Sequence, residues 1–213
     1  MPKHILDTDL YCLTAAHMSA GRSTLDVVAQ MLEAGVRLVQ YREKEKKAGE
    51  QYQECLRLRA MTREAGAALV VNDDVALAVA VGADGVHVGQ QDLPLPAVRQ
   101  VVGRDMAIGI STHSPQQARA AVAEGADYIG VGPLFATQTK ADVCEPVGLE
   151  YLDWVAANIA LPFVAIGGIK RHNVAEVVRR GAPCVALVSE ITAAADIGEA
   201  IRAVRAEMAE MWP

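Results

Sequence analysis

Short apolar runs alternate with longer amphipathic stretches along the chain. The runs are too short and too rich in β-branched residues to be buried helices, which favours strands. Polar residues or glycine follow each run before the next amphipathic stretch begins. We therefore expect eight strands, at Leu10–Leu13, Leu38–Tyr41, Ala68–Val71, Gly85–Val88, Met106–Ile110, Tyr128–Val131, Phe163–Ile166 and Cys184–Val188.

The stretches between the expected strands carry the start and stop signals of helices. A capping residue followed three positions later by glutamate or glutamine predicts helix starts at Ser114 with Gln117, Asn173 with Glu176, and Asp196 with Glu199. Glycine closes a helix readily because it adopts the left-handed conformation. It recurs at the expected helix ends, at Gly35, Gly66, Gly82, Gly125 and Gly181.

Strand–helix alternation predicts a parallel sheet whose strands are joined by helical crossovers. Eight such units predict the α/β class and a closed (β/α)₈ TIM barrel, a fold of ~250 residues with ~200 near its lower limit. The length of 213 residues fits one such domain over residues 1–213. An open doubly wound sheet is the alternative, but its G-x-G-x-x-G fingerprint is absent after the first strand.

Composition narrows the functional classes. Hydrophobic residues make up 52% of the chain and aromatic residues only 4%, so the core must be aliphatic, which suits buried parallel strands. The 20 Lys and Arg residues against 26 Asp and Glu residues give a net charge of −6, which disfavours a nucleic-acid binder. Anionic small molecules remain suitable ligands, because a few local cations suffice to hold them.

The cysteines and the N-terminus predict a cytoplasmic protein. The four cysteines are far apart and form no C-x-x-C pair, which is typical of reduced proteins, and most of them are expected to be buried: Cys12, Cys55, Cys144 and Cys184. Residues Met1–Leu10 lack the apolar core of a signal peptide. No apolar run approaches the ~18 residues of a membrane span. A homo-oligomer is compatible with the sequence.

Polar residues gather after the expected strands, where barrels of this kind carry their chemistry. Side chains alternate along a strand, so Gln40, Arg42 and Lys44 share one face of the second strand and its extension. Val39 and Tyr41 share the other face. We expect the polar face to point into the mouth of the barrel and the apolar face to meet the helices. The alternative is that Arg42 and Lys44 form only a solvated charge run.

Two aspartates at the ends of neighbouring strands predict a metal site. Asp73 and Asp92 follow the third and fourth strands, and neighbouring strands lie ~4.8 Å apart. Both carboxylates can then reach one ion, and an oxygen site with few protein ligands suits Mg²⁺ completed by phosphate and water. The alternative is that an aspartate here only caps the next helix, for which Asp74, next to Val75, is the better candidate.

The remaining polar residues predict two phosphate subsites. Arg42, Lys44 and Lys140 are three cations at the expected mouth, and together with Mg²⁺ they would neutralise a diphosphate. Gly167–Gly168 and Ser189 follow the seventh and eighth strands, where barrels often hold a phosphate through backbone N–H groups. The alternative for the glycine pair is a tight turn without a ligand.

Several short sequence motifs, taken together, resemble those of the thiamine-phosphate synthase family. They occur in order over almost the whole chain and are specific as a set: Gln40–Lys44, Asn72–Asp73, Gly85–Asp92, Gly109–His113, Gly130–Pro133, Thr137–Lys140 and Ala165–Ile169. The resemblance implies a transferase that joins hydroxymethylpyrimidine diphosphate to a thiazole phosphate, giving thiamine phosphate and diphosphate. It also implies a dissociative mechanism, in which diphosphate leaves first and the thiazole nitrogen captures the pyrimidine methylene cation.

The resemblance implies a role for each matching residue. The pyrimidine diphosphate would be bound by Gln40, Tyr41, Arg42, Glu43, Lys44, Asn72, Ser111 and Lys140. The thiazole phosphate would be bound by Thr137, Gln138, Thr139, Gly168, Val188 and Ser189. Asp73 and Asp92 would bind Mg²⁺, and Arg42, Lys44 and Lys140 would act in catalysis.

The sequence departs from the usual family pattern at Ala15, Tyr41, Gln91 and Glu190, of which Glu190 lies beside the second phosphate subsite. Two other functions remain as alternatives. One is an isomerase like thiazole tautomerase, which would need neither metal nor diphosphate. The other is a barrel that binds phosphorylated metabolites without turnover. The joint presence of the proposed metal, diphosphate and acceptor residues favours the synthase over both.

Overall fold

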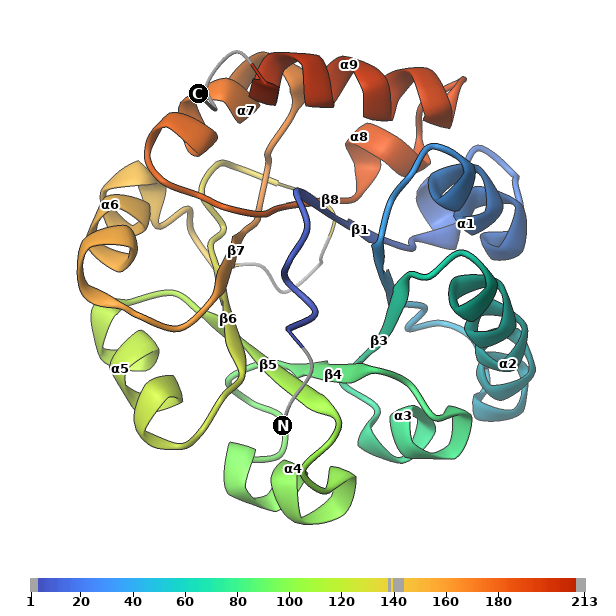
Figure 1. Ribbon diagram of the computed structural model, residues 1–213, viewed down its shortest axis with the longest axis horizontal. Helices are drawn as coiled ribbons and strands as arrows, with labels where there is room; N and C mark the ends of the chain where they lie inside the picture. The colour runs from blue at the N-terminus through green and yellow to red at the C-terminus, as the bar shows by residue number, and fades with distance from the viewer. Residues whose placement is uncertain (1–3, 138, 140–143, 210–213) are drawn as a thin grey trace.

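The chain folds into a closed barrel of eight parallel strands surrounded by helices. The computed structural model describes residues 4–137, 139 and 144–209. Each strand is hydrogen-bonded to the next along the chain, and β1 pairs with β8 to close the barrel. Figure 1 looks along the barrel and shows the helices arranged outside the ring of strands. The predicted (β/α)₈ barrel is confirmed, and the open doubly wound sheet is excluded.

The strands are β1 Leu10–Leu13, β2 Leu38–Tyr41, β3 Ala68–Asn72, β4 Gly85–Val88, β5 Ala107–Thr112, β6 Tyr128–Val131, β7 Phe163–Ala165 and β8 Val185–Leu187. The predicted bounds of β1, β2, β4 and β6 are confirmed, and the other strands differ from prediction by one or two residues at an end. The largest difference is in β5. Its polar end resembles a loop in the sequence, but Ser111 and Thr112 pair with β6.

The helices are η1 Ala16–Met18, α1 Thr24–Glu33, α2 Ala48–Glu64, α3 Val75–Val81, α4 Leu95–Val102, α5 Pro115–Ala123, α6 Gly148–Asn158, α7 Arg171–Arg179, α8 Ser189–Thr192 and α9 Ile197–Ala209. Ser114 caps α5 and Asp74 caps α3, as predicted. The prediction for Asn173 as a capping residue is wrong. Helix α7 begins earlier, and Asn173 Oδ1 instead accepts a hydrogen bond from the backbone N–H of Lys170.

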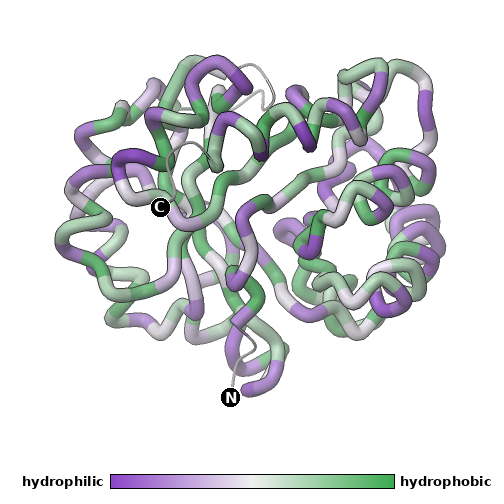
Figure 2. The backbone as a smooth tube through the Cα atoms, turned by 45° about the horizontal axis from the view of Figure 1, so that its top comes forward, coloured by the Kyte–Doolittle hydropathy of each residue, from purple (hydrophilic) through white to green (hydrophobic). Residues whose placement is uncertain are grey.

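Alternation along the strands divides the buried side chains into two sets. The larger set lies between strands and helices and includes Val39 and Tyr41 of β2. The smaller set fills the barrel and includes Tyr11, Leu38 and Tyr128. Figure 2 shows that the strands are mostly hydrophobic and that hydrophilic segments lie on the outer helices and loops. Aliphatic packing thus leaves the strand ends available for polar residues.

A cluster around Arg205 of α9 holds the last helix against the first strand–helix unit. The Arg205 guanidinium donates to both carboxylate oxygens of Asp9, at 2.6 and 3.0 Å, and to the backbone oxygens of Ala34 and Gly35. Asp9 directly precedes β1, which pairs with β8 where the barrel closes. These bonds reinforce the seam at which the barrel closes.

Among the described residues, no helix is both long enough and apolar enough to cross a membrane.

Candidate functional site

A cavity of about 500 Å³ opens at the carboxyl ends of the strands. Every strand or the loop after it contributes to its lining. Of the predicted site residues, it is lined by Arg42, Lys44, Asp73, Asp92, Ser111, Thr137, Thr139, Gly168, Val188 and Ser189. Gln138 and Lys140 lie outside the described residues. The structure therefore brings both proposed metal residues, five of the six proposed thiazole residues and three of the eight proposed pyrimidine residues to one cavity.

The cations after β2 lie beside the first aspartate. Lys44 Nζ is 3.1 Å from Asp73 Oδ2, and half of the lysine side chain is exposed. The backbone N–H of Arg42 donates to Thr14 Oγ1 at 2.9 Å, which fixes the guanidinium-bearing residue to the loop after β1. Burial lowers the pKa of Arg42, while the charges of Asp73 and Glu43 raise it. The guanidinium remains charged at any physiological pH and can hold an anion.

Asp73 occupies a strained turn that directs its carboxylate into the cavity. Its φ angle is 61°, in the left-handed region that non-glycine residues seldom adopt. The turn is closed by a hydrogen bond of 2.7 Å from Asp74 N to Asn72 O, and Asp73 N bonds to His87 O of β4. Asp74 caps helix α3. The two neighbouring aspartates thus have separate tasks, and strain of this kind is common at functional sites.

The two predicted metal ligands fit a site for a hard cation. Asp73 and Asp92 both line the cavity from the ends of adjacent strands, and Asp92 Oδ2 accepts a hydrogen bond of 2.7 Å from Gly89 N. No group of three or more His, Cys, Asp or Glu side chains suited to a metal occurs among the described residues. Two carboxylates alone match Mg²⁺, which keeps several waters and is completed by substrate phosphate.

Glycines permit a close approach of two loops on the opposite side of the cavity. A Cβ atom on Gly167 would lie 2.4 Å from Pro133 Cα, and one on Gly168 would lie 2.6 Å from Ala136 O. Both glycines also have positive φ angles, of 99° and 64°. The glycine pair therefore lets the loops after β6 and β7 approach each other closely, and both loops line the cavity.

A chain of hydrogen bonds crosses the barrel beneath the cavity. Gln40 Nε2 donates to Tyr11 Oη at 2.7 Å, and Tyr11 Oη lies 3.2 Å from Tyr128 Oη. Tyr128 Oη lies 3.0 Å from His87 Nδ1, and His87 Nε2 lies 3.0 Å from Ser111 Oγ. Burial raises the pKa of both tyrosines, which remain neutral donors. The chain links Gln40 below the cavity to Ser111 at its wall.

Comparisons with known proteins agree with this geometry. A family profile described as "Thiamine monophosphate synthase" matches residues 10–191, which is most of the chain. The chain belongs to the thiamine monophosphate synthase family. A protein of Pelotomaculum thermopropionicum named thiamine-phosphate synthase is 62% identical over 95% of this chain and 93% of its own length. A protein of the same name from Lawsonia intracellularis is 54% identical over 96% of this chain and 94% of its own length.

A solved structure is also similar to the whole chain. The thiamine phosphate pyrophosphorylase from Pyrococcus furiosus has a TM-score of 0.88 and 33% sequence identity, and the match covers 96% of this chain and 97% of that one. The barrel described here is therefore the fold of that family member as well.

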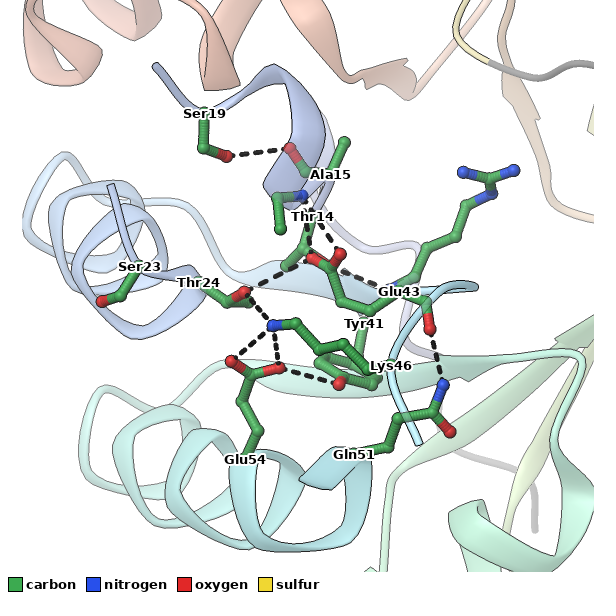
Figure 3. Close-up of polar contacts among 12 residues, drawn as sticks. Thr14, Ala15, Ser19, Ser23, Thr24, Tyr41, Glu43, Lys46, Gln51 and Glu54 are labelled. Carbon is green, nitrogen blue, oxygen red and sulfur yellow. Dashed lines mark hydrogen bonds and ion pairs between the residues drawn. The ribbon is translucent and has the colours of Figure 1, made fainter. Parts of the chain in front are cut away.

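Four residues that the family resemblance assigns to the pyrimidine do not line the cavity: Gln40, Tyr41, Glu43 and Asn72. Tyr41 faces the helices, as the alternation predicted, and donates to Glu54 Oε2 at 2.7 Å. Both carboxylate oxygens of Glu43 lie 3.1 Å from Ala16 N. Figure 3 shows these side chains within one polar cluster between the β1 and β2 loops and helix α2. Their assigned binding role stays a prediction, and the contacts seen favour anchoring of the loop.

Other residues line the cavity although the sequence did not single them out for binding, namely His113, Gln117, Cys144 and Lys170. His113 Nδ1 lies 2.6 Å from Gly132 O, which joins the ends of β5 and β6. Lys170 follows the glycine pair by two positions, and only the fold brings its side chain to the cavity. A cation two positions after a glycine pair at a strand end is the signal that could have identified it.

Proposed function

We propose that this chain joins hydroxymethylpyrimidine diphosphate to a thiazole phosphate, forming thiamine phosphate and releasing diphosphate. The observation that carries the proposal is the division of one cavity. Cations and carboxylates line the side formed by β2 to β4, while glycines, hydroxyls and Lys170 line the side formed by β6 to β8. The first side suits a metal-bound diphosphate, and the second suits a phosphate monoester. Membership of the thiamine monophosphate synthase family supports this transferase activity.

On the diphosphate side, Arg42 and Lys44 would bind the leaving group, together with Ser111 of β5. Arginine offers a planar fork to phosphate oxygens and lysine a point charge. Both interactions strengthen as negative charge develops on the departing diphosphate, which is the condition for catalysis by electrostatic stabilisation. The family resemblance adds Lys140 to these catalytic cations, and adds Gln40, Tyr41, Glu43 and Asn72 as pyrimidine ligands.

Mg²⁺ is the proposed cofactor, held by Asp73 and Asp92. When bound, the ion would neutralise charge on the diphosphate oxygens. Lys44 pairs with Asp73, so the same carboxylate also positions a cation for the diphosphate. This arrangement supports a site that is completed by the substrate rather than by a protein cage.

On the acceptor side, Thr137, Thr139, Gly168, Val188 and Ser189 would hold the thiazole phosphate, together with Gln138. Holding the acceptor fixed beside the pyrimidine methylene supplies the orientation that a dissociative reaction needs. The route requires help for a departing anion more than a strong base, and the charged side of the cavity fits that requirement. We therefore propose the dissociative order, with diphosphate leaving before the new bond forms.

We further propose that residues 1–213 act as one domain, in the cytoplasm, on small molecules and without nucleic acid. The negative net charge supports the last point. Three buried free thiols, at Cys12, Cys55 and Cys184, support a reducing compartment. The sequence and the fold are compatible with a homo-oligomer.

One assay tests the proposed function. The purified protein is mixed with both substrates and Mg²⁺, and thiamine phosphate and diphosphate are measured. We expect equal amounts of the two products and no reaction after chelation of Mg²⁺. Isomerisation of the thiazole without diphosphate release would instead identify a tautomerase. Binding of both ligands without either product would identify a binding protein.

A further inference from the structure

Lys170 reaches the acceptor side of the cavity from the start of helix α7. Its side chain lines the cavity together with Gly167, Gly168 and Ser189. Lys170 Nζ donates to Ser189 Oγ at 2.8 Å and lies 3.4 Å from Glu190 Oε2. About a third of the lysine side chain is exposed, so the ammonium remains accessible to a ligand in the cavity.

The backbone around this ammonium is fixed by three hydrogen bonds. The N–H of Lys170 donates to Asn173 Oδ1 at 2.7 Å, and Asn173 Nδ2 donates to Gly168 O. The second carboxylate oxygen of Glu190 accepts from Arg171 N at 3.1 Å. Glu190 therefore bridges α8 and α7, with one oxygen on the backbone of Arg171 and the other facing the Lys170 ammonium.

The hydrogen-bond donors of Lys170 and Ser189 favour an anion at this position. An ammonium has three N–H donors, and Lys170 gives only one of them to Ser189. The Ser189 hydroxyl accepts this bond, which leaves its own hydrogen to donate elsewhere. A cation and a hydroxyl donor thus lie side by side next to a glycine turn. The Arg42 and Lys44 cations belong to the opposite side of the cavity, after β2.

We propose that Lys170 binds the phosphate of the acceptor substrate, and that Glu190 limits this affinity by competing for the lysine ammonium. The inference rests on the proposed function, because it assigns the acceptor phosphate to this side of the cavity. It gives the second phosphate a cation of its own, separate from those that hold the diphosphate. It also gives a physical role to Glu190, a residue at which the sequence departs from the family pattern.

The proposal predicts opposite effects for the two members of one ion pair. Lys170→Met removes a charge-assisted contact, so the Kd for the thiazole phosphate should rise on the order of 10- to 100-fold. Glu190→Gln retains an oxygen acceptor for Arg171 N but removes the competing charge. The Kd should then fall roughly two- to fivefold, the scale of a partly exposed ion pair. A pair that served only to hold α7 and α8 together would give effects of one sign.

Isothermal titration of the full chain, without the pyrimidine substrate, measures these changes. The ligands are the thiazole phosphate and the corresponding thiazole alcohol, which lacks the phosphate. Lys170→Met should weaken binding of the phosphate and leave binding of the alcohol unchanged. Arg171→Met is the matched control, because it removes a neighbouring positive charge that is directed toward Glu207. It should leave the affinity for both ligands close to that of the parent protein.

Several results would overturn the proposal. These are equal losses in Lys170→Met and Arg171→Met, a parallel loss for the alcohol, or weaker phosphate binding in Glu190→Gln. Thermal melts confirm that each variant is folded, and Glu190→Gln gives an independent arm if Lys170→Met is not. Measurements of turnover distinguish a failure of this inference from a failure of the proposed function. Normal synthesis of thiamine phosphate with an unchanged KM for the thiazole phosphate in Lys170→Met rejects only the inference. Absence of synthesis by the parent protein rejects the function.

Discussion

Replacement of Glu43 by alanine should lower both the stability and the affinity for the pyrimidine diphosphate. Glu43 is only 8% exposed, and its carboxylate accepts the backbone N–H of Ala16 with both oxygens at 3.1 Å. A further contact, of 3.4 Å, comes from Thr24 Oγ1. A hydrogen bond to a charged group contributes about 1.5–3 kcal/mol. At about 2–4 °C per kcal/mol for a domain of this size, the Tm should fall by roughly 3–12 °C.

The expected loss of affinity for the pyrimidine diphosphate follows from Arg42, the residue before Glu43. Arg42 N donates to Thr14 Oγ1, in the same loop that Glu43 ties down through Ala16 (Figure 3). Once this loop loosens, the Arg42 guanidinium loses its fixed position at the cavity. Small misplacements of a binding group reduce rates strongly, so we expect the KM for the pyrimidine diphosphate to rise on the order of 10-fold.

Glu54→Gln is the matched control for this experiment. Glu54 belongs to the same polar cluster and binds Lys46 and Tyr41, but it makes no hydrogen bond to the loop after β1. It should lower the Tm and leave the KM unchanged. Thermal melts and steady-state kinetics with varied pyrimidine diphosphate decide the matter. A Glu43→Ala variant with parental stability and a raised KM would mean that Glu43 contacts the ligand directly. Lost stability with an unchanged KM would mean that it does not position Arg42.

Three further perturbations test other parts of the molecule. Tyr128→Phe removes the hydrogen bond to His87 in the barrel interior, so the free energy of unfolding in urea should fall by about 1–3 kcal/mol. Titration should also show a weaker affinity for the pyrimidine diphosphate. Parental values in both measurements would refute the link between the barrel interior and the cavity. Asp92→Ala should abolish most Mg²⁺-dependent synthesis at an unchanged Tm, and a normal Mg²⁺ dependence would argue against a metal ligand there. Burial raises the pKa of Asp9, but the bonds and charge of Arg205 lower it more, so the folded pKa lies below the ordinary value. This stabilisation is present above the pKa that Asp9 has in the unfolded chain, and it is lost as the pH falls below about 4. Asp9→Asn should therefore reduce the loss of stability between neutral and acid pH. Parallel stability curves for the variant and the parent protein would contradict this.

The periodicity of the sequence predicted the barrel, the outward direction of Tyr41 and the cavity position of Arg42, because alternation along a strand is a local property. Contacts between segments that are distant in the sequence were harder to predict. Gln40 does point inward, yet it lies one layer below the cavity, where it bonds to Tyr11. The family resemblance marks five consecutive residues at the end of β2 and directly after it, but alternation allows only every second side chain to face the barrel.

The position of Lys170 could not be predicted from its neighbours in sequence. Its side chain meets Ser189 and Glu190, which lie about twenty positions away and belong to the next strand–helix unit. The start of α7 was misassigned for a related reason. Asn173 has the composition of a capping residue, but its amide instead binds backbone groups of Lys170 and Gly168 on the preceding loop.

The seam between β1 and β8 has a consequence for synthesis of the chain on the ribosome. β1 is made first, but its second hydrogen-bonding partner, β8, is the last strand to emerge. The bonds from Arg205 to Asp9 come later still. Until then a nascent chain exposes the unpaired edges of β1 and β7, which can pair with other chains. Translation that stalls before β8 therefore leaves an open, aggregation-prone sheet, and the two edges are covered only when β8 pairs with both β1 and β7.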